Sequence, residues 1–94
     1  KYPEVRRDLA LLLDHNVRFK DIEDLAYQTE RKTLKRVSLF DVYQGEHIED
    51  GFKSYAFRMV FQDDEKTLKD KEVDKSIQTI MKRLEQDLGA EIRK

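Results

Sequence analysis

Three side chains in residues 39–57 suit the recognition of an unpaired base: Asp41, Tyr43 and Ser54. The tyrosine ring offers a flat surface for a stacked base, and such stacking is typically worth ~1–3 kcal/mol. An ionised carboxylate only accepts hydrogen bonds, so Asp41 could accept both N–H donors of a guanine Watson–Crick edge and reject adenine. Ser54 can donate or accept at a second edge, and the small Ala56 leaves room for a base to approach.

Hydrophobic periodicity predicts the elements that position these side chains. In chain order, the expected elements are a strand over 7–14, a helix over 19–30, strands over 34–43 and 52–62, a helix over 73–88 and a short strand over 90–93. Gly45 and Gly51 favour a hairpin between the two long strands. Gly89 is expected to end the second helix, as a glycine past a helix terminus commonly does.

This order, β-α-β-β-α-β, is typical of the ferredoxin-like fold, in which two helices cover one face of a four-stranded antiparallel sheet. Right-handed crossovers then give the strand order 4-1-3-2. The expected fold class is therefore α+β, in one domain over residues 1–94. One face of the sheet stays open, because both helices lie on the other face.

Strand alternation predicts which side chains lie on that open face. On the 52–62 strand, the large apolar residues are expected to face the helices: Tyr55, Phe57, Met59 and Phe61. The open face of this strand would then carry Ser54, Ala56 and Arg58. On the 34–43 strand, the expected core residues are Phe40 and Val42. The residues expected to point outward there are Val37, Leu39, Asp41 and Tyr43.

The charge pattern restricts how a nucleic acid could be bound. The net charge is −1, without the basic excess usual in nucleic-acid binders, and residues 37–66 hold three basic and seven acidic side chains. An RNA bound there would be read through its bases more than through its phosphates. Lys53 and Arg58 are the expected contacts to an RNA backbone. A basic cluster at Arg31, Lys32, Lys35 and Arg36 could add others, or could equally be a solvated helix end.

Composition argues against several other classes of protein. The chain has no cysteine, so disulfide scaffolds and thiolate metal sites are excluded. His15 and His47 stand beside turn-like residues and are expected to be solvated rather than metal ligands. With no long apolar run and no signal-peptide pattern, we expect no membrane association and a cytoplasmic setting. The first residue, Lys1, suggests a segment of a longer polypeptide.

An ordered set of short motifs runs along the chain: Tyr2-Pro3, Arg7-Asp8-Leu9-Ala10, Leu39-Phe40-Asp41-Val42-Tyr43-Gln44-Gly45, Gly51, Lys53-Ser54 with Ala56, Thr67-Leu68, Glu72-Val73, Gly89-Ala90 and Ile92-Arg93. With this set the chain resembles the ferredoxin-fold anticodon-binding domain at the C-terminus of the bacterial phenylalanyl-tRNA synthetase β subunit. The resemblance covers essentially the whole chain.

The resemblance implies that the open sheet binds the anticodon of phenylalanine tRNA. It also implies that Asp41, Tyr43 and Ser54 contact the first anticodon base, a guanine. The domain itself would have no catalytic residue, metal or cofactor, since ATP and magnesium would bind elsewhere in the parent ligase. The implied protein partner is the α subunit, in an α2β2 heterotetramer.

The chain departs from the resemblance at two helix starts. Lys69 and Arg18 stand where a small hydroxyl residue is common, so we expect Asp70 to cap the second helix and to shift its start by one residue.

Two alternative functions stay open. The open sheet could pack on a neighbouring domain of the parent protein, which exposed Val37 and Leu39 would favour. An acylphosphatase-like enzyme is the weakest alternative, because residues 14–16 lack the glycines of a phosphate-cradling loop.

Overall fold

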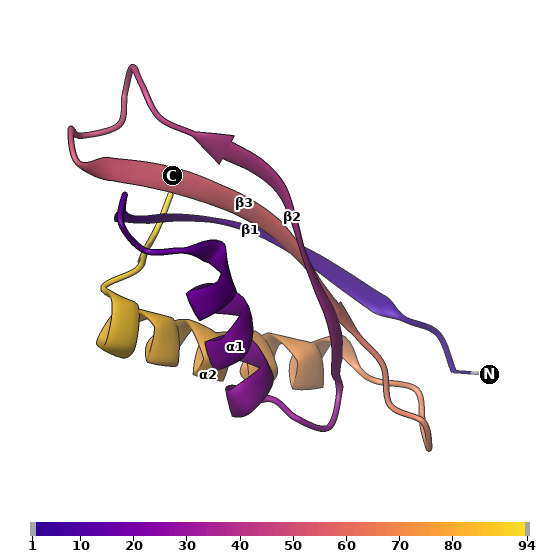
Figure 1. The fold of residues 1–94 in the computed structure, drawn as a ribbon. Coiled ribbons are helices and arrows are strands. Elements are labelled where there is room, and N and C mark those ends of the chain that lie inside the picture. Colours follow the sequence, from indigo (N-terminus) through magenta and orange to yellow (C-terminus); the bar gives the residue numbers. More distant parts are fainter. Residues whose placement is uncertain (1, 94) are drawn as a thin grey trace.

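The computed structural model describes residues 2–93 (Figure 1). Its elements are β1 (Val5–Asp14), α1 (Phe19–Thr29), β2 (Leu34–Tyr43), β3 (Phe52–Phe61), α2 (Asp70–Leu88) and β4 (Glu91–Ile92). The strands pair antiparallel in the order β2-β3-β1-β4, which confirms the expected α+β, ferredoxin-like fold with strand order 4-1-3-2. Gly89 follows α2 with a φ of 69°, as predicted. The expected domain bounds include residues 1 and 94, which lie outside the described residues.

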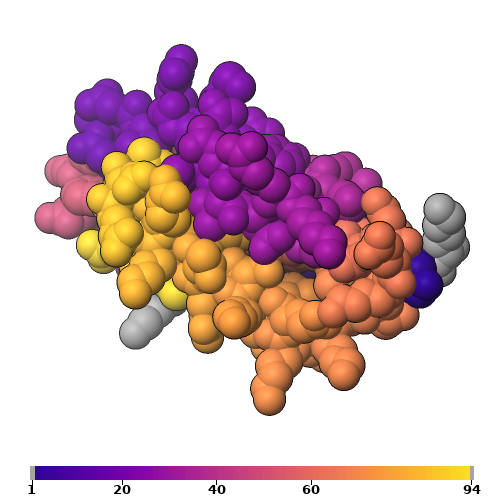
Figure 2. All heavy atoms as spheres, turned by 90° about the horizontal axis from the view of Figure 1, so that it is seen from below, coloured from indigo at the N-terminus to yellow at the C-terminus, as the bar shows by residue number. Residues whose placement is uncertain are grey.

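Both helices cover one face of the sheet. They lie below the strands in Figure 1, and Figure 2, seen from below, shows α1 and α2 side by side over that face. The core fills the space between the two layers, and its largest fully buried members include Leu11, Leu13, Ile22, Phe57, Phe61, Ile80 and Leu84. Over residues 2–93 no helix lies on the opposite face, which is therefore open as predicted. No helix of this part of the chain combines the length and apolar character needed to cross a bilayer.

The helix-facing side of β3 is the one that alternation predicts. Tyr55 is 3% exposed, and the other three residues of the predicted set are fully buried. The Phe19 ring of α1 packs against Phe57 edge-on, with ring centroids 5.5 Å apart. The Tyr55 hydroxyl donates a hydrogen bond to the carbonyl of Val17, so burial does not leave this phenol unpaired.

The side chains of β2 do not alternate regularly between the two faces of the sheet, because the strand contains two irregularities. They interrupt the pairing with β3 between Leu34 and Arg36 and between Leu39 and Asp41. An extra residue in one strand changes which residues of that strand share a face. A prediction that assumed one period along the whole strand is therefore wrong for part of it.

Val37 and Leu39 lie on the helix side of the sheet, contrary to the prediction. Val37 pairs with Met59 and is 6% exposed, and Leu39 pairs with Phe57. The Val37 amide donates to the Tyr27 hydroxyl of α1 at 2.9 Å, which satisfies an N–H group on this edge strand. These two residues therefore give no support to a docking surface on the open face.

Phe40 was expected in the core, and this prediction is also wrong. The residue is 58% exposed, and its ring centroid lies 6.0 Å from the guanidinium carbon of Arg58, on the open face. Val42 pairs with Tyr55 on the helix side as expected, but it is 47% exposed because β2 is the edge strand.

The two helices begin without a capping hydroxyl. The N-cap of α2 is Lys69, so the expected shift of the cap to Asp70 does not occur. Instead the Glu72 carboxylate accepts the Lys69 amide at 3.0 Å, and in α1 the Asp21 carboxylate accepts the Arg18 amide at 3.3 Å. An acidic side chain three residues into the helix thus supplies the half of a capping box that does not need a serine or threonine.

Candidate nucleic-acid interface

The strand register arranges the open face in rows of side chains. Residues paired across neighbouring strands share a face. From the hairpin end to the other end, the rows across β1, β3 and β2 are Leu12–Ser54–Tyr43, Ala10–Ala56–Asp41, Asp8–Arg58–Ser38 and Arg6–Val60–Arg36. The second row places two small side chains beside a carboxylate. The expected site residues Asp41, Tyr43, Ser54 and Ala56 are thus brought together on one face.

The Asp41 carboxylate is an available acceptor. The residue is exposed, and within residues 2–93 no ion pair or hydrogen bond occupies its carboxylate. Ala56 and Ala10 continue its row and leave a low floor next to it. A flat group lying on that floor would meet the carboxylate at its edge.

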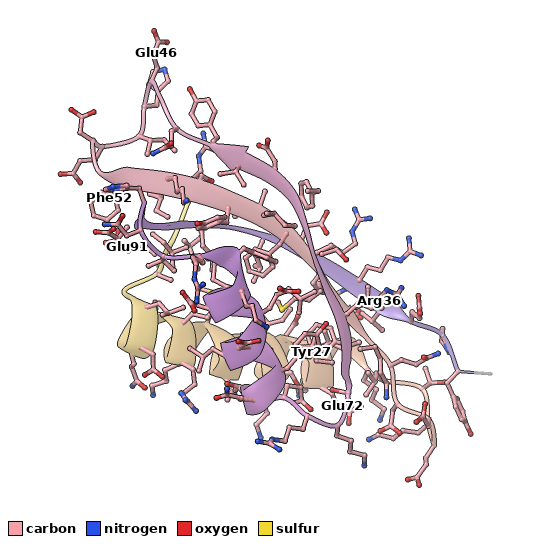
Figure 3. The ribbon with its side chains drawn as sticks, in the orientation of Figure 1. Tyr27, Arg36, Glu46, Phe52, Glu72 and Glu91 are labelled. Atoms are coloured by element: carbon pink, nitrogen blue, oxygen red, sulfur yellow. The ribbon has the colours of Figure 1, made fainter. Side chains whose placement is uncertain are left out.

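The Tyr43 ring is held against the hairpin loop. Its hydroxyl donates to the Glu46 carbonyl at 3.0 Å. Gly45 has a φ of 137°, and a Cβ at this position would stand 3.3 Å from the Tyr43 hydroxyl oxygen. Glu46 stands at the tip of this loop, at one end of the sheet (Figure 3). The glycine therefore lets the loop approach the phenol closely, and the loop fixes the ring at the end of the open face.

Arg93 is a member of this site to which sequence analysis assigned no role. Its amide donates to the Ala10 carbonyl at 2.9 Å, which continues the pairing of β4 with β1. Its guanidinium donates to the Ser54 hydroxyl at 3.3 Å and its guanidinium carbon lies 5.2 Å from the centroid of the Tyr43 ring. Ser54, which also lies between Leu12 and Tyr43 of the neighbouring strands, is only 2% exposed. Two signals in the sequence pointed to Arg93: it belongs to the Ile92-Arg93 motif, and it lies on the last predicted strand, which the predicted strand order places beside the first strand.

The two expected backbone contacts, Lys53 and Arg58, lie on different faces. Lys53 pairs with buried Leu13, and its ammonium lies 5.0 Å from the centroid of the Tyr55 ring, on the helix side. Arg58 lies on the open face, where its Nε and Nη2 donate to the two carboxylate oxygens of Asp8 at 2.8 and 3.1 Å.

The Asp8–Arg58 pair shifts the acidity of both groups. The hydrogen bond from Arg58, and then its positive charge, hold the pKa of the Asp8 carboxyl below its ordinary value of 3.8, although desolvation opposes this. The same contact raises the pKa of Arg58. Both groups are therefore charged at neutral pH, and Arg58 faces the open surface with a counter-ion already bound.

The predicted basic cluster over residues 31–36 does not form one surface. Lys32 and Lys35 pair with Asp63 and Asp64, at 4.0 and 3.8 Å. Arg36 lies on the open face instead. The cluster is therefore neither one solvated helix end nor one continuous basic surface.

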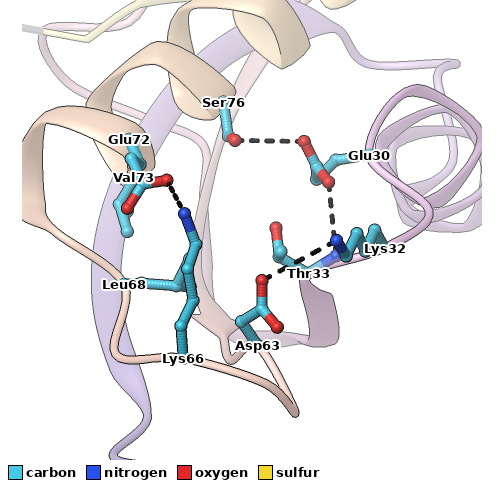
Figure 4. Close-up of a pocket in the computed structure, with 9 residues that line it drawn as sticks. All are labelled: Glu30, Lys32, Thr33, Asp63, Lys66, Leu68, Glu72, Val73 and Ser76. Carbon is cyan, nitrogen blue, oxygen red and sulfur yellow. Dashed lines mark hydrogen bonds and ion pairs between the residues drawn. The ribbon is translucent and has the colours of Figure 1, made fainter.

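A hollow on the helix side lies between the ends of the two helices and the 62–69 loop (Figure 4). Its polar lining groups bind one another: Glu30 accepts from the Ser76 hydroxyl at 3.0 Å, and Lys66 donates to Glu72 at 2.6 Å. Buried Asp63 accepts the Glu65 amide at 2.8 Å. These contacts fasten the loop to the helices, and we assign this hollow no ligand.

Comparison with known proteins identifies the family of this chain. A family model described as ferredoxin-fold anticodon binding domain matches residues 1–93. The chain is similar to phenylalanine–tRNA ligase β subunits from Bacteroides fragilis (55% identical), Porphyromonas gingivalis (52%) and Bacillus subtilis (42%), each over 93 residues and 99% of the chain. It spans only 11–12% of the length of these relatives. The chain belongs to the ferredoxin-fold anticodon binding domain family.

Proposed function

We propose that this chain is the anticodon-binding module of a phenylalanine–tRNA ligase β subunit and that it reads the first anticodon base of phenylalanine tRNA, a guanine. The observation that carries this proposal is the row Ala10–Ala56–Asp41, which joins a low floor to an exposed carboxylate on an uncovered sheet face. Tyr43 stands in the next row and adds an aromatic ring. Unpaired RNA bases are typically bound in this way, by stacking and by hydrogen bonds to their edges.

Each group has a defined role in this proposal. The guanine stacks on the Tyr43 ring and lies over Ala56, and Asp41 accepts the two Watson–Crick N–H donors of the base. Because Arg93 covers the Ser54 hydroxyl in the free chain, the entering base displaces the Arg93 guanidinium. Ser54 is then free to hydrogen-bond a second edge, and Arg93 can bind the phosphate of the same nucleotide.

The rest of the ligase would carry out the chemistry. This module contributes tRNA affinity and identity checking, while ATP and magnesium bind elsewhere in the longer protein. The longer protein would act in the cytoplasm with its α subunit, in an α2β2 assembly. The names of the relatives, phenylalanine–tRNA ligase β subunits, support the assignment to such a ligase.

The test is a titration of this chain with four anticodon stem-loops that differ only in the first anticodon base. We expect guanine to bind most tightly and Asp41→Ala to reduce its advantage over adenine by ~5–150-fold, because two hydrogen bonds to one base edge are worth ~1–3 kcal/mol. Asp50→Ala, which removes an exposed carboxylate from the hairpin loop, is the matched control. Equal affinity for all four stem-loops, or an unchanged guanine preference in Asp41→Ala, would refute the proposal.

A second candidate function is packing of the open face on a neighbouring domain. Exposed Phe40 now favours it in place of Val37 and Leu39. Footprinting of the longer protein separates the two functions, because protection of the hairpin only after tRNA is added supports anticodon binding. The acylphosphatase-like alternative loses support. Such a site needs backbone N–H groups that can bind a phosphate after the first strand, and here the Asn16 amide already donates to the Asp14 carboxylate at 2.8 Å.

A further inference from the structure

The open face carries a second feature at the end away from the hairpin loop. It is a hollow of about 270 Å³, which we call the arginine hollow, lined by Arg6, Arg36, Ser38, Phe40, Arg58 and Val60. The three arginines come from three different strands, β1, β2 and β3. Arg36 lies toward the opposite end of the sheet from Glu46 in Figure 3. The proposed reading of the first anticodon base does not use this hollow, although two residues of its lining, Arg36 and Arg58, were considered as contacts to an RNA backbone.

The guanidinium groups of the hollow exceed the carboxylates that bind them. Arg36 donates to both Glu4 oxygens at 3.4 Å, and Arg58 is bound to Asp8. The Arg6 side chain is 63% exposed, and it approaches the same Glu4 only to 4.0 Å. Three positive charges thus meet two negative ones, in a chain whose net charge is −1. Since each guanidinium has five N–H donors, donors remain for an anion such as a phosphodiester.

The hollow also presents an aromatic ring to solvent. The irregularity between Leu39 and Asp41 turns Phe40 onto the open face, where it is 58% exposed beside Arg58. Below it, Val60 is 3% exposed and forms the floor. Arginines beside an exposed aromatic ring are the combination with which proteins hold single-stranded nucleic acid, by charge and by stacking.

Arg6 and Arg36 lie two rows away from Asp41 on the open face, whereas Phe40 directly precedes Asp41 in β2. Ala56 and Val60 are four residues apart on β3, which is about 13 Å along the strand and several times the distance between stacked bases. We propose that the arginine hollow binds a second nucleotide of the same single-stranded RNA loop, with its phosphate on Arg6 and Arg36 and its base on Phe40. This inference rests on the proposed function, because the same RNA must also reach Asp41.

The first experiment measures how the affinity of this chain for the anticodon stem-loop depends on salt. For Arg6→Ala/Arg36→Ala we expect weaker binding and a salt slope smaller by about 0.7, the value for one phosphate contact to a single strand. The preference for guanine should not change, because Asp41 is untouched. Lys75→Ala/Lys82→Ala removes the same charge from exposed positions of α2, on the other side of the sheet, and is the matched control. A slope equal to that of the wild type would overturn the proposal.

The second experiment tests stacking. Phe40→Leu keeps an apolar side chain but removes the ring, and we expect it to weaken stem-loop binding by about 5-fold or more. Backbone amide shifts recorded during the titration locate the contact: signals at Arg6 and Arg36, which lie two rows from Asp41, should move together with those at Asp41. If only the signals near Asp41 and Tyr43 shift, the proposed site for a second nucleotide is refuted and the proposed function stands. Shifts at the hollow alone would overturn both.

A protein partner for the hollow gives a different result. If the hollow instead packs on another domain, Phe40→Leu and Arg6→Ala/Arg36→Ala would bind the stem-loop as the wild type does, and the proposal would fail. All three changed side chains are exposed, so these variants should keep the fold. Far-ultraviolet circular dichroism verifies this before each titration.

Discussion

Two phenylalanines of this sheet should differ strongly in what they contribute to stability. Regular alternation would place both Phe40 and Phe57 in the core, whereas the structure leaves Phe40 58% exposed and Phe57 fully buried. The comparison tests the irregularity before Asp41, and with it the placement of Asp41 on the open face. We expect Phe57→Ala to destabilise the chain severely and Phe40→Ala to change its stability little.

The magnitudes follow from burial. A buried phenylalanine replaced by alanine costs ~3–5 kcal/mol, a large part of the ~5–14 kcal/mol expected for the unfolding of a chain of this length. Phe40 has about two fifths of its surface buried, and full burial of such a side chain is worth ~1.5–3 kcal/mol. Its replacement should therefore cost about 0.6–1.3 kcal/mol, and less if the unfolded chain already buries part of the ring.

Urea denaturation followed by circular dichroism measures these costs. Two valines of β2 provide an independent pair, because Val37 is 6% exposed and Val42 is 47% exposed. Val37→Ala should cost about 1.6 kcal/mol or more, from two buried methylene equivalents, and Val42→Ala about half of that. The reasoning is refuted if Phe40→Ala costs about 3 kcal/mol or more, as a core phenylalanine does, or if the order of the two valines is reversed.

Two further predictions concern charge and backbone. The hydrogen bond from the Lys66 ammonium, and then that from the Lys69 amide, hold the pKa of the Glu72 carboxyl below its ordinary value of 4.5. Glu72 therefore stabilises the fold above that pH and loses this effect as it is protonated, so the stability difference between the wild type and Glu72→Gln should shrink as pH falls from about 5 to about 3. Denaturation at several pH values checks this, and a difference that does not depend on pH would contradict it. Gly45→Ala should cost ~1–3 kcal/mol and shift the Tyr43 ring signals, because a positive φ strains alanine and its Cβ would crowd the Tyr43 hydroxyl; unchanged denaturation and ring signals would argue against this close approach.

Local patterns in the sequence were sufficient to predict the helices and strands and their order along the chain. The helical spacing from Val73 to Leu88, and the alternation of β3 from Tyr55 to Phe61, reflect contacts that each element makes with one core. These patterns repeat within a single segment, so they can be read without knowing what lies beside it. The open face follows from the same information, since the order of elements places both helices on one side. Asp41 and Tyr43 were correctly assigned to that face, although Val37 and Leu39, predicted to accompany them, were not.

The tertiary structure alone decided how the open face is composed. The irregularity that turns Phe40 outward exists only in the pairing of β2 with β3, because a strand's register depends on its neighbour. Arg93 covers Ser54 from the far end of the chain, and Asp8 binds Arg58 across 50 residues. Such contacts depend on which strands lie next to one another and on how far long side chains reach. The hydrophobic periodicity of a single segment contains no information about either. The sequence by itself therefore determined the fold and a polar face, whereas the packing of distant residues determined which groups on that face are free to bind.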